Sequence, residues 1–186
     1  MLPRAYRARA HLVENAIAPL ARTPNGAVAV QWKRRYNIGP GAVISCIGRL
    51  SPEKGQDLLL EAARLLRARG HAFQLVFVGD GPTRADLEER MLVLGLAGAV
   101  HFVGQQQEMD VVYRATDVLV LPSRKEGMPN VILEAMLHGL PIVSTQVGAV
   151  PAMLRADVEA ALVPVGDAQA LAGALERVIV DPQFAA

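Results

Sequence analysis

From residue 43 onward, short apolar runs alternate with longer segments in which apolar residues recur every three or four positions. The short runs, rich in Val, Ile and Leu, have the length of buried strands, and the longer segments have helical periodicity. The predicted strands are residues 43–47, 73–78, 100–103, 118–121, 142–144 and 161–163. The predicted helices are residues 56–69, 83–94, 108–114, 130–138 and 167–180, with Thr83 as a side-chain N-cap.

Strands that alternate with helices predict a doubly wound, Rossmann-like α/β domain, in which a parallel sheet carries helices on both faces. We expect this domain over residues 41–186, a length that suits a single domain. Residues 1–40 are expected to form an N-terminal segment or linker. Within it, residues 5–17 are compatible with a helix, and Pro24-Asn25-Gly26 predicts a turn.

The loops that follow the strands are the expected location of the chemistry. Right-handed crossovers bring all strand-to-helix loops to one edge of a parallel sheet. Ligands of such sheets bind outside the carboxyl ends of the strands. The loops concerned are residues 48–55, 79–83, 104–107, 122–130 and 145–149.

The loop at 48–55 carries two cations, Arg49 and Lys54, between two glycines, Gly48 and Gly55. Arginine presents a planar fork to phosphate oxygens, lysine presents a point charge, and glycine lets backbone approach a ligand. Taken alone, however, the loop is better explained as a surface turn with solvated charges. The next loop, which starts at Gly79, is a turn that also fits close approach of a ligand.

Two carboxylates mark the loop at 122–130 and the helix that follows it. Glu126 lies in the loop, and Glu134 lies about one turn inside the helix, so both are expected to face one cleft. The amide end of that helix favours an anion. Exposed carboxylates are the simpler alternative. Because Glu134 lies in an apolar run, however, it needs a partner, and a hydroxyl-rich ligand would supply one.

Composition and charge exclude several classes of protein. The chain is 52% hydrophobic and 20% charged with a net charge of +1, so nothing draws it to nucleic acid. The single cysteine, Cys46, is expected in the core, and a reducing, cytoplasmic location follows. No apolar run reaches the length of a membrane span. Basic clusters at residues 4–9 and 33–35 leave peripheral membrane contact as a weaker possibility.

Six motifs in order resemble the donor-binding, C-terminal domain of retaining glycosyltransferases of the two-lobed GT-B architecture, especially glycosyltransferase family 4 (group 1). The motifs are Gly48-Arg49-Leu50 with Glu53-Lys54-Gly55, Val78-Gly79-Asp80-Gly81-Pro82, His101-Phe102-Val103-Gly104, Asp117-Val118-Leu119-Val120-Leu121-Pro122-Ser123, Glu126-Gly127-Met128-Pro129-Asn130-Val131 through Glu134-Ala135-Met136, and Gly139-Leu140-Pro141-Ile142-Val143. The resemblance covers about residues 43–180 and implies a single Rossmann-like lobe.

The resemblance also implies a role for each matched residue. Arg49 and Lys54 would bind the donor diphosphate and stabilise the leaving group, and Glu126, which completes the catalytic set, would hold hydroxyls of the transferred sugar. Glu134 would hold the ribose hydroxyls. The other donor-binding positions it implies are Gly48, Gly79, Val103, Gly127, Met128, Asn130 and Val131, with Val103 and Gly104 near the base. We expect no cofactor and no metal site, because the four histidines are scattered.

Family members carry a second lobe that binds the acceptor, and the chain has no room for it. We therefore expect a partner lobe or subunit, or self-association through an exposed apolar face. A non-catalytic nucleotide-sugar-binding module remains an alternative function, and a sugar epimerase or phosphorylase of similar architecture is a less favoured one. No residue identifies the base, the sugar or the acceptor.

Overall fold

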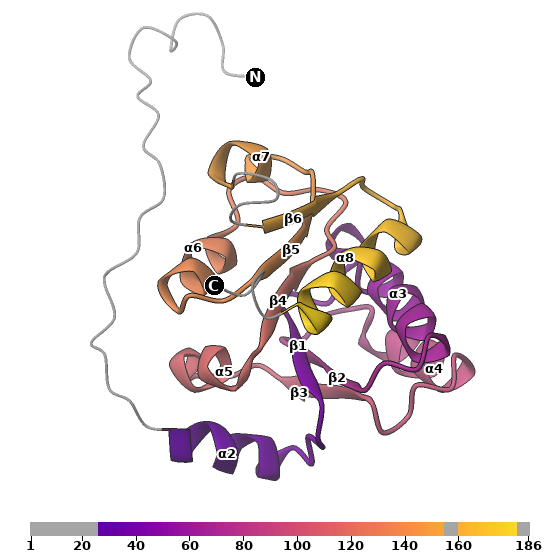
Figure 1. Cartoon of the computed structure of the whole chain (residues 1–186), viewed down its shortest axis with the longest axis vertical. Helices are drawn as coiled ribbons and strands as arrows, with labels where there is room; N and C mark the ends of the chain where they lie inside the picture. Colours follow the sequence, from indigo (N-terminus) through magenta and orange to yellow (C-terminus); the bar gives the residue numbers. More distant parts are fainter. Residues whose placement is uncertain (1–25, 155–159, 182–186) are drawn as a thin grey trace, which may run out of the picture.

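The computed structural model describes residues 26–154 and 160–181, and it contains one parallel sheet of six strands in that part. The strand order is β3-β2-β1-β4-β5-β6 (Figure 1). The strands are β1 (Ala42–Ile47), β2 (Phe73–Val78), β3 (Val100–Gly104), β4 (Val118–Leu121), β5 (Ile142–Thr145) and β6 (Ala160–Val163). The doubly wound, Rossmann-like fold predicted from the sequence is confirmed.

Helices cover both faces of the sheet. One face carries α3, α4 and α8, and the other carries α2, α5, α6 and α7 (Figure 1). The helices are α2 (Gly26–Arg35), η1 (Pro52–Lys54), α3 (Gln56–Ala68), α4 (Arg84–Val93), α5 (Met109–Ala115), α6 (Asn130–Leu137), α7 (Val150–Met153) and α8 (Ala168–Val180), of which η1 is a 3-10 turn.

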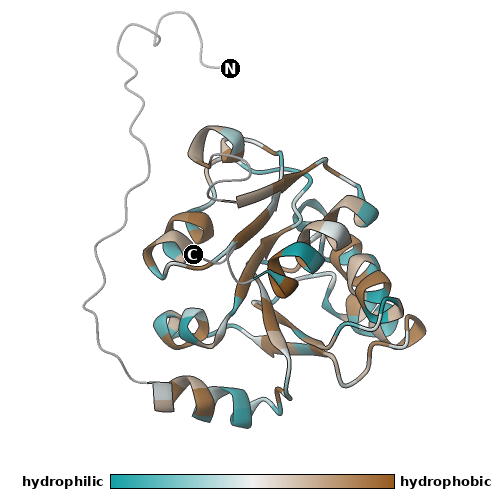
Figure 2. Ribbon diagram, in the orientation of Figure 1, coloured by the Kyte–Doolittle hydropathy of each residue, from teal (hydrophilic) through white to brown (hydrophobic). Residues whose placement is uncertain are grey.

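The core is aliphatic because both faces of the strands are covered. All six residues of β2 and all four of β4 are buried. Hydrophobic residues accordingly run along the strands, while the helices alternate between hydrophobic and hydrophilic residues (Figure 2). Fully covered parallel strands of this kind explain why the sequence shows continuous apolar runs rather than alternation.

Three local features differ from the sequence predictions. Helix α2 was not predicted, and Gly26, expected in a turn, is its first residue. Thr83 stands at the N-cap of α4, but its hydroxyl makes no capping bond and is buried without a partner among the described residues. The short helix α7 lies just past the loop predicted at 145–149. The helix considered for residues 5–17 lies outside the described residues.

At one position in the sheet, the chain connections that follow two neighbouring strands run in opposite directions. Strand β1 pairs with β2 on one side and with β4 on the other. The chain leaves β1 toward β2, whereas the strands from β4 onward extend the sheet in the opposite direction. The loops after β1 and β4 therefore flank a crevice, the position at which open α/β sheets bind ligands.

Candidate functional site

A cleft of about 780 Å³ opens at the carboxyl ends of β1, β2 and β3. Gly48, Arg49 and Gly79, all predicted to contact a ligand, line it. The sequence analysis did not single out Gln106 and Met109, which also line it, although Gln106 lies in a loop expected at this edge. Lys54, Glu126 and Glu134 are not among the lining residues, so the predicted site residues fall into more than one group.

Gly48 and Gly79 bring the loops after β1 and β2 into backbone contact. The Gly48 N–H donates to the Val78 carbonyl at 2.9 Å, and the Leu50 N–H donates to the Asp80 carbonyl at 3.0 Å. A Cβ atom at Gly79, where φ is 132°, would lie 2.1 Å from the Gly48 carbonyl oxygen. The close approach of the two loops therefore leaves no room for a side chain at position 79. It also exposes the backbone of Gly48 and Gly79 at the wall of the cleft.

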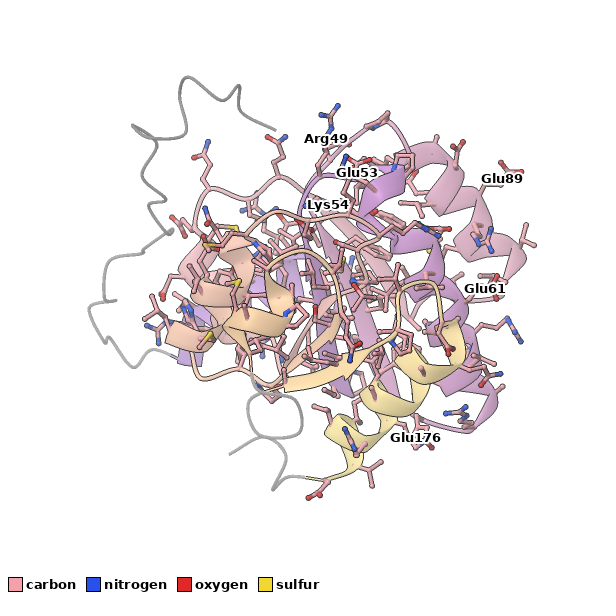
Figure 3. The ribbon with its side chains drawn as sticks, turned by 90° about the horizontal axis from the view of Figure 1, so that it is seen from above. Arg49, Glu53, Lys54, Glu61, Glu89 and Glu176 are labelled. Carbon is pink, nitrogen blue, oxygen red and sulfur yellow. The ribbon has the colours of Figure 1, made fainter. Side chains whose placement is uncertain are left out.

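Arg49 is the cation of the cleft. Its side chain is exposed, and no hydrogen bond or salt bridge within the described residues engages its guanidinium group. It lies at the same edge of the molecule as Glu53 and Lys54 (Figure 3). An exposed guanidinium group without a partner can offer all five of its N–H donors to a ligand.

Lys54 and Glu126 form an ion pair across the crevice between β1 and β4. Lys54 Nζ lies 2.7 Å from Glu126 Oε1, and the Ser123 hydroxyl donates to the same oxygen at 2.7 Å. The Glu126 side chain is only 7% exposed, so the pair is largely removed from solvent. Glu126 Oε2 has no hydrogen bond within the described residues.

The same two loops are held together by their backbones. The Arg124 N–H donates to the Glu53 carbonyl at 2.8 Å, and a Cβ atom at Gly55 would lie 2.1 Å from the Pro122 carbonyl oxygen.

Cys46 is buried near the Lys54–Glu126 ion pair, and its burial raises the pKa of its thiol to about 12. Cys46 is therefore a protonated core residue, as predicted.

Glu134 was expected to need a partner, and one of its carboxylate oxygens has a partner within the protein, a tyrosine hydroxyl. The Tyr113 hydroxyl donates to Glu134 Oε2. Burial, followed by the effect of the Glu134 carboxylate, raises the pKa of Tyr113, so its hydroxyl remains a donor at all physiological pH values. Glu134 Oε1 has no hydrogen bond within the described residues.

Helices α5 and α6 are joined around this pair. The ring of His138 stacks on Tyr113, with 4.7 Å between centroids. His138 Nε2 lies 3.1 Å from Asp110 Oδ1, and its Nδ1 lies 2.8 Å from the Glu134 carbonyl oxygen. The Arg114 guanidinium, which donates to Asp110 at 2.6 Å, holds the pKa of that carboxyl below its usual value. Tyr113, which holds the Glu134 side chain, is thus itself held in place by His138 at the end of α6.

The remaining predicted positions lie around these groups. Val103 is buried at the end of β3, and Gly127 is exposed where a Cβ atom would meet nothing within 4 Å. Asn130 and Val131 open α6, where no side chain caps the helix, and Met128 lies just before it. Glu126 and Glu134 therefore belong to one loop and its helix, although they have separate partners.

The described residues offer neither a cluster of metal ligands nor a membrane-spanning helix. Residues 26–154 and 160–181 contain no group of three or more His, Cys, Asp or Glu side chains arranged to hold a metal ion. None of the helices within these ranges combines the length and apolar character needed to cross a bilayer.

Comparison with known families decides the identity of the domain. The sequence model of the family described as "Glycosyl transferases group 1" matches residues 41–181. The chain belongs to this family. The match begins immediately before β1 and ends just past α8, so it leaves out α2.

Curated relatives are similar to this group 1 domain over part of their length. An alpha-D-kanosaminyltransferase from Streptomyces kanamyceticus is 33% identical over 156 residues, which are 83% of the chain and 40% of that protein. A D-inositol 3-phosphate glycosyltransferase from Saccharomonospora viridis is 36% identical over 155 residues, 77% of the chain and 36% of that protein. The chain thus spans well under half the length of these relatives.

Solved structures share the fold of this group 1 domain. Crystalline Anabaena HepE in complex with UDP and glucose matches with a TM-score of 0.78 and 26% identity, over 88% of the chain and 45% of HepE. The C-terminal domain of the group 1 family glycosyl transferase LpcC from Francisella tularensis matches with a TM-score of 0.76 and 28% identity, over 88% of the chain and 86% of that domain. The fold is therefore that of a GT-B C-terminal domain.

Proposed function

We propose that this chain is the donor-binding lobe of a retaining glycosyltransferase of the family 4 type, which binds a nucleotide-diphosphate sugar for transfer of a hexosyl group. The observation that carries the proposal is the arrangement at one edge of the sheet. The cleft with the unengaged Arg49 lies beside a crevice closed by the Lys54–Glu126 pair. That HepE was crystallised with UDP and glucose supports a nucleotide-sugar ligand.

The two cations would have different tasks. Breaking the anomeric bond leaves a nucleoside diphosphate on which negative charge grows. Arg49, which has no salt bridge in the described residues, would bind and stabilise that diphosphate. Lys54 already contacts Glu126, so it would orient this carboxylate while adding positive charge nearby. A preorganised donor of this type typically lowers the barrier by about 3 kcal/mol.

Both glutamates are held through one oxygen and have the other available. Lys54 and Ser123 engage Oε1 of Glu126, and Tyr113 engages Oε2 of Glu134. The free oxygen of each carboxylate would accept a hydrogen bond from a hydroxyl group, that of the sugar at Glu126 and that of the ribose at Glu134. A fixed carboxylate loses little conformational entropy when the ligand binds.

Three further expectations from the sequence form part of this proposal. The lobe works without a metal or cofactor, it lies in the cytoplasm and can contact the membrane surface, and it pairs with an acceptor lobe or a partner subunit. The exposed large hydrophobic side chains of the described residues lie on α2, α4, α6 and α8, except Val165, which follows β6.

A thermal-shift panel of uridine, guanosine and adenosine diphosphates, and of their sugars, tests the proposal. A nucleotide present at about 100 times its dissociation constant stabilises the fold by about 2.7 kcal/mol. We expect one base to give this shift in the wild type, and Arg49→Ala to reduce it. The matched control is Arg67→Ala, since Arg67 is an exposed arginine in the last turn of α3.

The outcomes separate the candidate functions. If no nucleotide shifts the wild type, or if the shift survives Arg49→Ala and Glu134→Ala, the proposal is wrong. If the nucleotide binds, mass spectrometry of a mixture of donor and acceptor distinguishes transfer from a binding module without turnover. Products formed from donor alone would instead indicate an epimerase or a phosphorylase.

A further inference from the structure

One residue of the cleft wall is held by a helix outside the segment that matches the family. Gln106 lines the cleft, between β3 and α5. Its side-chain carbonyl oxygen accepts hydrogen bonds from the Trp32 indole N–H at 3.1 Å and from the Tyr36 hydroxyl at 3.2 Å. Trp32 lies in α2 and Tyr36 directly follows it, whereas the family match begins at residue 41.

The amide nitrogen of Gln106 is also fully engaged. It lies 2.9 Å from the Tyr36 hydroxyl oxygen, 2.8 Å from the Val103 carbonyl oxygen and 3.2 Å from the Gln105 carbonyl oxygen. All donors and acceptors of this side chain are thus used within the protein. A side chain bonded at every polar atom has one orientation, and it fixes the backbone of the segment on which it lies.

Helix α2 is itself anchored. Trp32 is 8% exposed and packs in a cluster with Ala29, Val76 and Val103, which joins α2 to β2 and β3. The Trp32 and Tyr36 rings lie 5.1 Å apart. The support for Gln106 therefore comes from a rigid part of the fold rather than from a mobile surface side chain.

We propose that Trp32 and Tyr36 are positioning residues of the nucleotide site. They hold Gln106, and with it the cleft wall at residues 104–106, in the shape that accepts a nucleoside diphosphate. This inference rests on the proposed function and adds α2 to the site. Because Trp32 is the only tryptophan of the chain, its fluorescence reports directly on this wall.

Amide hydrogen exchange tests the support without any ligand. Tyr36→Phe removes both hydrogen bonds of the hydroxyl and keeps the ring, so the fold is retained. Each lost hydrogen bond corresponds to about a fivefold change in an opening equilibrium. We therefore expect exchange at the amides of β3 that pair with β2 beside this wall, residues 101–104, to become at least about fivefold faster in Tyr36→Phe and in Trp32→Phe. The control, Gln31→Ala, changes an exposed residue of α2 and should leave this exchange unchanged.

Calorimetric titration with UDP, GDP and ADP tests the consequence for binding. For the nucleotide that binds the wild type, we expect the dissociation constant to rise about fivefold in Tyr36→Phe and to stay unchanged in Gln31→Ala. The emission of Trp32 in the wild type should change on titration with the same dissociation constant. A role in stability alone would lower the melting temperature and leave this constant and the emission unchanged.

The results separate this inference from the proposed function. If the wild type binds none of the nucleotides, the proposed function fails and this inference with it. If the wild type binds a nucleotide but Tyr36→Phe binds it equally well, or if exchange at residues 101–104 of β3 is unaltered, only the positioning role of α2 is overturned.

Discussion

At the scale of single residues, close backbone contacts between loops determine where glycine is required. Gly55 ends η1 with φ 69°, and Gly95 follows α4 with φ 68°, so both occupy the left-handed region. A Cβ atom at Gly55 would lie 2.1 Å from the Pro122 carbonyl oxygen, whereas one at Gly95 would meet nothing within 4 Å. The two positions therefore share the backbone conformation and differ in the packing.

Alanine substitution at these two glycines separates the two costs. Gly95→Ala should lower the free energy of unfolding by about 1–2 kcal/mol, the cost of the left-handed conformation. Gly55→Ala adds a clash with the backbone of the loop after β4, and the loss should exceed about 3 kcal/mol. Urea denaturation measures both. Equal losses would show that the loops after β1 and β4 are not packed as described.

The hydrogen bond from the Tyr113 hydroxyl to Glu134 also makes a contribution to stability that can be measured. Tyr113→Phe removes the donor to a carboxylate oxygen, so stability should fall by about 1–2 kcal/mol. A double-mutant cycle with Glu134→Ala isolates the pair, and the two losses should be clearly less than additive because each variant removes the same hydrogen bond. Additive losses by chemical denaturation would contradict this contact.

At the scale of elements, ion pairs fasten helices to one another across the outer surface. Helix α8 packs on α3, and Glu176 of α8 accepts one hydrogen bond from Arg69 at 2.6 Å. Its other carboxylate oxygen lies 2.6 Å from His71 Nε2, and both partners lie just past the end of α3. His71 and Arg69 lower the pKa of Glu176 below its ordinary value of 4.5. Glu176 lies far from the edge that carries Arg49 (Figure 3).

This lowered pKa gives a pH dependence of known sign. A carboxyl group whose pKa is lower in the folded state stabilises the fold above its unfolded pKa, and the contribution is lost as the pH falls through the folded value. Glu176→Gln should therefore lower the melting temperature at about pH 7, and the difference from the wild type should shrink as the pH falls below 4.5 and through the lowered pKa of Glu176. Glu89→Gln, an exposed glutamate without a salt bridge in the described residues, is the control. A difference that persists at low pH would contradict the ion pair.

How far the sequence predicts an element depends on how local its determinants are. The strand at 118–121 and the helices α6 and α8 are marked by apolar runs and by glycine or a side-chain N-cap, so their positions were predicted nearly to the residue. Helix α2 was missed because its stability depends on distant residues, such as Gln106, which is 74 positions from Trp32. The partner of Glu134 was missed for the same reason, since nothing local points to Tyr113, 21 positions earlier.

At the scale of the whole molecule, the topology brings separate loops to one working edge. The predicted sites at Gly48, Arg49 and Gly79 converge on the cleft, while Lys54 and Glu126 meet beside it, between β1 and β4. The convergence could be predicted from right-handed crossovers alone. The division into an open cleft and a closed ion pair could not, because it depends on the strand order β3-β2-β1-β4-β5-β6.

The most direct test of the central claim, that this edge binds a nucleoside diphosphate, is the electron density of a crystal grown with the nucleotide that gives the largest thermal shift. The account predicts that the diphosphate contacts Arg49 and the backbone at Gly48, with the base against residues 104–106 and the ribose hydroxyls toward Glu134. Nucleotide density anywhere else on the molecule, with this cleft empty, would contradict it.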